Sequence, residues 1–125
     1  MNNLKQVKVL AIDELIEESV TLLICGESVE CFANYCPNLI QVGEMHTVEL
    51  SIDYSETYQV RENPKTNVCI EKANEGFSYF FYGFLNGEVF ETFTDLPDEG
   101  IHFDYPELNG KFVKIKVDRV NVSFM

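Results

Sequence analysis

Positive charge is scarce over most of this 125-residue chain. Residues 9–60 and 73–110 hold 18 of the 21 aspartate and glutamate residues and contain no lysine or arginine. The formal net charge of -12 repels polyanions at long range and attracts cationic partners. This distribution predicts an acidic face with a small basic stripe, and a basic protein as the partner in preference to a nucleic acid.

Sequence motifs for catalysis are absent as well. The chain has no G-x-S-x-G, H-E-x-x-H, C-x-x-C, Walker or dinucleotide-binding fingerprint, and its only histidines are His46 and His102. Carboxylates are so abundant that pairs at any spacing arise by chance, so none indicates a glycosidase-type site. His102 lies between acidic residues, where an ordinary loop histidine is a better interpretation than a pH-sensing one. We predict no catalytic residue, no cofactor and no enzymatic activity.

Long apolar runs are missing too. The first 18 residues, MNNLKQVKVLAIDELIEE, contain no apolar stretch behind a basic leader, and no segment is long enough to span a bilayer. We therefore expect a cytoplasmic protein without a membrane partner. Its 125 residues, 46% of them apolar, suit one domain, residues 1–125, with a single core.

Four cysteines raise the question of a metal site. Cys31 and Cys36 have a C-x4-C spacing, and Cys25, Cys69 or His46 could complete a zinc site. The spacing matches no known zinc motif, however, and buried thiols are commoner than irregular zinc sites. We predict reduced cysteines and no bound metal.

Apolar residues that alternate with polar ones predict β-strands almost everywhere. Residues 47–54 follow this period closely, so one face of that strand should be buried and the other wet. In the last segment the apolar positions change parity, from Val113, Ile115 and Val117 to Val120, Val122 and Phe124. A residue inserted near Asp118 and Arg119 accounts for the change. We predict a β-bulge that bends this final strand.

Turn residues predict how the strands connect. Asn86-Gly87 lies between two apolar runs and predicts a type I′ hairpin, because both residues tolerate positive φ. Gly26-Glu27 predicts a type II′ hairpin, with glycine at the first central position. Further strands are expected near residues 5–12 and 66–72, and short helical turns near residues 13–18 and 70–76.

Seven or eight short strands with a bulged last strand indicate an all-β fold, either a small closed barrel or, as the alternative, a two-sheet β-sandwich. The stretches LIQVGEMHTVELSI (residues 39–52) and LNGKFVKIKVDRVNVSF (residues 108–124) resemble the middle and closing strands of small bacterial OB-like barrel domains. We therefore expect an OB-like barrel. The resemblance implies a binding module, because such barrels often bind oligonucleotides, oligosaccharides or proteins.

Half of the phenylalanine and tyrosine residues lie in one segment, residues 77–93. In an OB-type nucleic-acid binder such aromatics stack bases beside a cationic groove. The groove is poor here, since the last strand offers roughly three phosphate contacts against the 6–10 of strong phosphate-driven binders. The solvent-facing residues expected on that strand are Lys114, Lys116, Arg119, Asn121 and Ser123. We therefore predict an aromatic strand buried on both faces and no retention of nucleic acid at physiological salt.

A segment that combines acids with apolar anchors follows the aromatic residues directly. The partner-binding residues that we predict there are Asp95, Asp98, Glu99, Ile101, Phe103, Asp104 and Tyr105. Interfaces draw affinity from a few buried apolar groups, while charge chiefly sets orientation and on-rate. The alternative is that Pro97 and Pro106 stiffen a connection whose apolar residues fold back onto the barrel.

These patterns favour a non-enzymatic interaction module that presents an acidic face to a cationic protein. Immunity-like or antitoxin-like inhibition of a basic nuclease is one form of such a function, supported by charge alone. The alternative is a small-molecule-binding barrel or a small enzyme with a pocket near the aromatic hairpin. A filled barrel interior favours protein binding, whereas a deep cavity lined by tyrosine, His102 and carboxylates favours the alternative.

Overall fold

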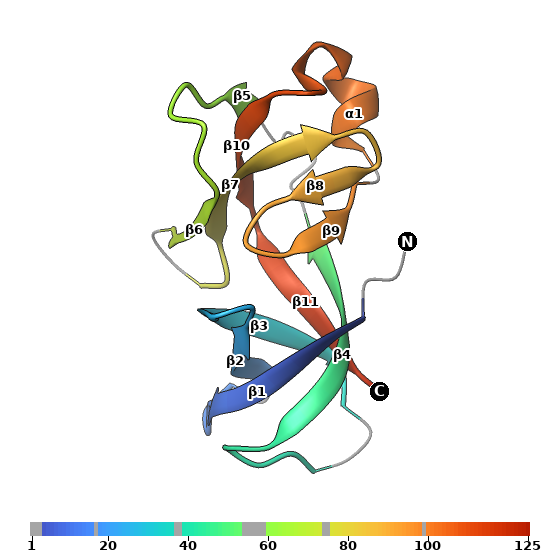
Figure 1. The fold of residues 1–125 in the computed structure, drawn as a ribbon. Coiled ribbons are helices and arrows are strands. Elements are labelled where there is room, and N and C mark those ends of the chain that lie inside the picture. Colours follow the sequence, from blue (N-terminus) through green and yellow to red (C-terminus); the bar gives the residue numbers. More distant parts are fainter. Residues whose placement is uncertain (1–3, 17, 37–38, 54–59, 74–75, 99) are drawn as a thin grey trace.

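The computed structural model describes residues 4–16, 18–36, 39–53, 60–73, 76–98 and 100–125. Helical residues in this part of the chain are confined to the four-residue α1 (Ile101–Asp104) and the three-residue 3-10 turn η1 (Pro106–Leu108). The all-β prediction is therefore confirmed. Figure 1 shows the strands in two groups, a barrel below and a second sheet above it.

Five strands close the barrel in the order β1-β2-β3-β11-β4. Their bounds are β1 (Leu4–Ile12), β2 (Ser19–Ile24), β3 (Glu27–Tyr35), β4 (Met45–Asp53) and β11 (Arg119–Phe124). All neighbours are antiparallel except β3 and β11, which run parallel. A closed five-stranded barrel is the architecture of an OB fold, so the expected OB-like barrel is confirmed.

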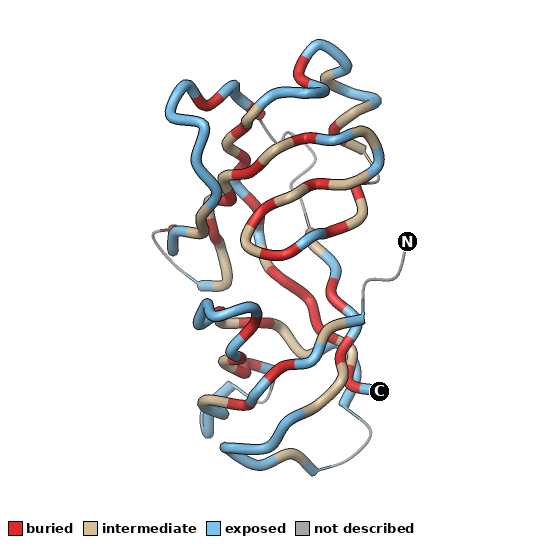
Figure 2. Tube along the Cα trace, in the orientation of Figure 1, coloured by how far each residue is buried: buried red, intermediate tan, exposed pale blue. Residues whose placement is uncertain are grey.

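The second sheet is inserted between β4 and β11. Its strands are β5 (Val60–Glu62), β6 (Cys69–Lys72), β7 (Tyr79–Asn86), β8 (Val89–Glu91), β9 (Asp95–Pro97) and β10 (Phe112–Val117). β10 pairs with one edge of β7, while β6 and β8 pair with the first and second halves of its other edge. The described chain thus has more strands than the seven or eight expected, because the insertion forms a sheet of its own. Buried apolar side chains of both sheets form one cluster, and Figure 2 shows buried residues in both groups of strands.

The bulged last strand links the two sheets. β10 and β11 are separated only by Asp118, whose backbone N–H donates to the carbonyl oxygen of Asp53 at 2.8 Å. The apolar positions on both sides of this break are buried, namely Val113, Ile115, Val117, Val120, Val122 and Phe124. The predicted bulge is confirmed. It lets a continuous run of chain place one face in the second sheet's core and the other in the barrel.

Both predicted hairpins form, but each turn lies one residue away from its predicted place. Asn86 pairs with Val89, so the loop is Gly87-Glu88, with Gly87 at a φ of 60°. Ile24 pairs with Glu27, and the loop residues Cys25 and Gly26 have φ values of 49° and 84°. Positive φ at both central residues is typical of type I′. The hairpin at Cys25-Gly26 therefore has a type I′ turn and not the predicted type II′ turn. Burial of alternate strand residues sets the register and overrides turn preference.

Neither predicted helical turn forms in the described residues. In residues 13–16, the Asp13 carboxylate accepts the backbone N–H groups of Leu15 and Ile16, and this local bonding competes with a helix. Residues 70–72 belong to β6 and pair with β7. The strand predicted at residues 47–54 is β4, which ends at Asp53; Tyr54 lies outside the described residues.

Candidate functional site

Asp98, one of the predicted partner-binding residues, is buried inside the turn that it organises. Its carboxylate accepts the backbone N–H groups of Ile101 and His102 at 2.9 Å each and that of Gly100 at 3.3 Å. Its Oδ2 also lies 2.7 Å from Nδ1 of His102. These bonds satisfy N–H groups at the start of α1 that would otherwise have no acceptor. Asp98 therefore fixes the shape of the segment from within.

Phe103 is the apolar residue that this turn presents to solvent. It is 74% exposed, and its ring centroid lies 4.3 Å from that of His102. Ile101, two residues earlier, is fully buried and anchors α1 in the core. The alternative, in which the apolar residues fold back onto the protein, therefore holds for Ile101 but not for Phe103.

The other predicted residues surround Phe103 in the sequence. Asp104, in α1, and Asp95, on β9, are exposed, and Tyr105 is half-buried. Glu99 lies outside the described residues. The exposed part of the predicted surface thus consists of one aromatic ring with carboxylates on either side along the chain. Its role as a partner-binding surface stays a prediction.

The aromatic strand β7 is buried on one face and not on both, contrary to expectation. Tyr79, Phe81 and Leu85 point into the core, whereas Phe80, Tyr82 and Phe84 are half-buried on the outer face. Alternate side chains of a strand point to opposite faces, and those of one face of β7 join the core. On the outer face the rings are covered in part by Lys114, whose Nζ lies 4.5 Å from the centroid of Phe80.

The expected basic stripe is interrupted. Lys114 and Lys116 lie on β10 beside β7, while Arg119 pairs with Asp53 at 2.7 Å and stacks on the Phe32 ring at 4.1 Å. Asn121, expected to face solvent, is buried between Phe32 and Ser51 in the barrel wall. A stripe broken in this way offers few phosphate contacts, and the absence of nucleic-acid binding stays a prediction.

A shallow cleft of about 330 Å³ lies between the β2–β3 hairpin and strands β6 and β7. Its lining residues are Thr21, Glu27, Ser28, Glu30, Ile70, Lys72 and Tyr79. The hydroxyl oxygen of Tyr79 accepts the Glu30 backbone N–H at 2.8 Å, and Lys72 Nζ lies 3.8 Å from the Glu30 carboxylate. No histidine is among the described lining residues.

The cysteines occupy dissimilar environments. Cys31 is buried in the barrel, Cys69 is half-buried, and Cys25 and Cys36 are exposed. Burial, together with the nearby Glu30 carboxylate, raises the pKa of the Cys31 thiol to about 12. In the described chain, no three histidine, cysteine or acidic side chains gather in a geometry that could hold a metal ion.

None of the helices in the described residues has the length and apolar character needed to cross a membrane. A family profile matches residues 2–125, and that family is described as uncharacterised conserved protein UCP019853. No curated protein and no solved structure matches the chain. The match therefore covers nearly all of the chain and carries no activity with it.

Proposed function

The chain belongs to this uncharacterised family, and we propose that it is a non-enzymatic interaction module whose acidic face binds a cationic protein partner. The exposed ring of Phe103 is the observation that carries the proposal. An aromatic side chain at the centre of a contact supplies much of the affinity of an interface, and the flanking acids Asp95 and Asp104 steer a basic partner toward it.

The bonds to Asp98 support the proposal because they hold the turn in one conformation before any partner arrives. Three backbone N–H groups and the His102 ring converge on this one buried carboxylate. A surface that is already ordered loses little conformational entropy on binding. The filled interior of the barrel also favours binding at the surface over binding inside.

Charge extends the proposal to the kind of partner and its location. A net charge of -12 suits inhibition of a basic nuclease by an immunity-like or antitoxin-like mechanism, in which the acidic face covers the phosphate-binding surface. We place this activity in the cytoplasm of a bacterium, as the sequence patterns and the resemblance imply.

Affinity capture from cell extract tests the proposal when it is combined with variants. Phe103→Ser should weaken binding of the captured protein by about tenfold or more, because it removes the apolar anchor. Val68→Ser is the matched control, since Val68 is an exposed apolar residue outside this segment. A captured protein that binds wild type and Phe103→Ser equally well, or one that carries net negative charge, would contradict the proposal.

The cleft beside Tyr79 favours a second candidate, binding of a small polar molecule. Its mixed lining of carboxylates, hydroxyls and Lys72 suits a zwitterion better than an apolar ligand. Ligand-detected NMR with a library of amino acids and small amines tests this candidate. Saturable binding that is lost in Glu30→Gln would support it, and no binding at millimolar ligand would exclude it.

A further inference from the structure

Exposed apolar side chains gather at one end of the barrel. Strands β1, β3 and β11 end there, and β2 and β4 begin there, because β3 and β11 are parallel and the other neighbours antiparallel. Eight of the twelve large apolar residues that are exposed in the described chain lie at this end: Ile12, Leu15, Ile16, Tyr35, Leu39, Val42, Met45 and Met125. This end lies at the bottom of Figure 1, away from α1.

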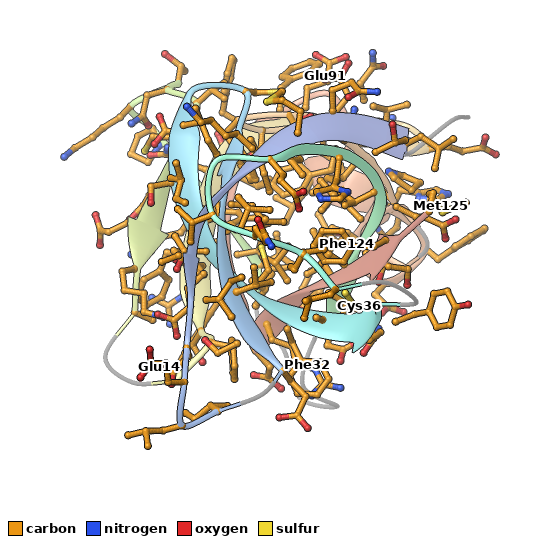
Figure 3. The ribbon with its side chains drawn as sticks, turned by 90° about the horizontal axis from the view of Figure 1, so that it is seen from below. Glu14, Phe32, Cys36, Glu91, Phe124 and Met125 are labelled. Carbon is orange, nitrogen blue, oxygen red and sulfur yellow. The ribbon has the colours of Figure 1, made fainter. Side chains whose placement is uncertain are left out.

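Figure 3 looks onto this end of the barrel, with Glu14 on one side of the rim and Cys36 and Met125 on the other. The exposed residues come from the β1–β2 loop, the β3–β4 loop and the adjoining strand ends. Single exposed apolar residues are ordinary, whereas a concentration at one place marks an interaction surface. The exposed apolar residues at this end of the barrel therefore indicate an interaction surface.

The β1–β2 loop holds its apolar residues out by internal hydrogen bonds. Asp13 Oδ1 accepts the N–H groups of Leu15 at 2.8 Å and Ile16 at 3.0 Å, and the Ile16 carbonyl accepts the Ser19 N–H at 3.0 Å. The Asp13 N–H donates to the Ser19 carbonyl and closes the loop. Leu15 is 95% exposed although its backbone is tied down in this way.

The β3–β4 loop uses the same device. Glu44 Oε1 accepts the Gln41 N–H at 2.7 Å and lies 3.1 Å from Nε2 of His46. The Gly43 N–H donates to the carbonyl of Val9, and the Val9 N–H donates to that of Glu44, so the loop is bonded to β1. Val42 stays exposed between these bonds.

The charge of this end is negative. Asp13, Glu14, Glu18 and Glu44 are exposed there, and residues 9–60 contain no lysine or arginine. The backbone hydrogen bonds from Ile16 and Leu15 lower the pKa of Asp13. The backbone hydrogen bond from Gln41, together with the contact with His46, lowers the pKa of Glu44, so both carboxylates stay ionised. An anionic membrane surface is an unfavourable occupant for such an end, because it would repel these carboxylates.

We propose that this end of the barrel docks a basic amphipathic segment of a protein partner. The apolar side chains of the segment cover Leu15, Leu39 and their neighbours, while its lysine or arginine residues pair with the surrounding carboxylates. Charge complementarity selects this occupant, and apolar contact supplies the affinity. The site is separate from the surface around Phe103, so this proposal does not depend on the function proposed above.

Fluorescence anisotropy with a defined probe tests the proposal. The probe is a labelled 18-residue peptide of lysine and leucine arranged as an amphipathic helix; glutamate–leucine and lysine–serine peptides of the same pattern are the controls. Wild type should bind the lysine–leucine peptide, and Leu15→Ser with Leu39→Ser should weaken binding by about tenfold or more, as expected for two leucines that become buried. Both substitutions are on the surface and should leave the unfolding midpoint unchanged.

Val68→Ser is the matched variant, because it removes an exposed apolar side chain outside this end and outside the surface around Phe103. It should leave peptide affinity unchanged. Equal binding of the glutamate–leucine peptide, or equal loss in Val68→Ser, would overturn the proposal. So would sedimentation with anionic vesicles in place of peptide binding, or a wild-type dimer that the double variant converts to monomer, because the occupant would then be a lipid surface or a second copy of the chain.

Discussion

The buried carboxylate of Asp98 lies 2.7 Å from the ring nitrogen Nδ1 of His102, four residues further along the chain. The next side chain, Phe103, is the large apolar residue that this turn leaves in solvent. Internal hydrogen bonding and external apolar exposure are thus found together within a single turn.

Two loops at the far end of the barrel share this relationship. Asp13 organises the loop that exposes Leu15, and Glu44 organises the loop that exposes Val42. These bonds fix the two loop backbones in conformations that leave the apolar side chains in solvent. The acids of this protein therefore have a structural role as well as an electrostatic one.

Asp98→Ala should lower the free energy of unfolding by about 2 kcal/mol, because three backbone N–H groups lose a charged acceptor. Urea titration followed by circular dichroism measures the change. Asp95→Ala is the control and should stay within about 0.5 kcal/mol of wild type, as surface substitutions do. Equal effects of the two substitutions would remove the special role of Asp98.

Gly83→Ala should destabilise the second sheet more than Gly87→Ala. A methyl group on Gly83 would lie 2.5 Å from the carbonyl oxygen of Glu91 and 2.9 Å from the Cα of Thr92, so the backbone of the neighbouring segment would have to move. Overpacking of this kind costs about 1–3 kcal/mol.

At Gly87 the added group meets open space and only the positive φ of 60° opposes it. Thermal unfolding of the two variants side by side decides the comparison. A higher midpoint for Gly83→Ala than for Gly87→Ala would show that the strands separate easily at this point.

Tyr79→Phe should cost about 1 kcal/mol of stability, because the Glu30 N–H loses its acceptor at the junction of the barrel and the second sheet. Tyr82→Phe, on the outer face of the same strand, is the control. Amide hydrogen exchange at Glu30 gives a direct reading and should speed up in Tyr79→Phe alone. Unchanged exchange there would mean that this bond is not made in solution.

The stability of the wild type should fall relative to Cys31→Val as pH rises above about 9. The pKa of the buried thiol is raised from 9.0 to about 12, so the unfolded chain loses this proton at a lower pH than the folded chain. Between these values the unfolded state binds fewer protons, and stability therefore decreases with pH. Denaturant titrations at pH 8, 9 and 10 should show the two curves diverge; parallel curves would place Cys31 in a wetter site.

Strand periodicity was sufficient to predict an all-β fold and its bent last strand, while the resemblance to OB-like domains favoured a barrel over a sandwich. The parity change around Asp118 is a local signal, because a residue added to a strand moves every later side chain to the other face. The stretch of residues 39–52 likewise carries the alternation of β4 in its own sequence. Features of this kind need no knowledge of distant residues.

Burial and turn position depend on tertiary packing and were not predictable in this way. The four residues of α1 are too few to show a helical period. The sequence therefore carries no signal for the capping role of Asp98 and predicts this residue as part of a surface. The exposure of Leu15 and Leu39 is set by the folded loops that carry them, so the apolar pattern of the sequence does not predict it. The outer face of β7 is half-buried, with Lys114 of β10 over its rings, and is not buried as the aromatic run predicts.

The association rate with a cationic partner, measured by stopped-flow fluorescence over a range of salt concentrations, tests the acidic face most directly. We predict that the rate falls several-fold as ionic strength rises from about 20 to 200 mM, and that Asp95→Asn with Asp104→Asn lowers it at low salt without changing the unfolding midpoint. Glu49→Gln with Glu71→Gln, which removes the same charge elsewhere, should lower it less. An association rate that is independent of salt and equal in all three proteins would contradict the proposed function.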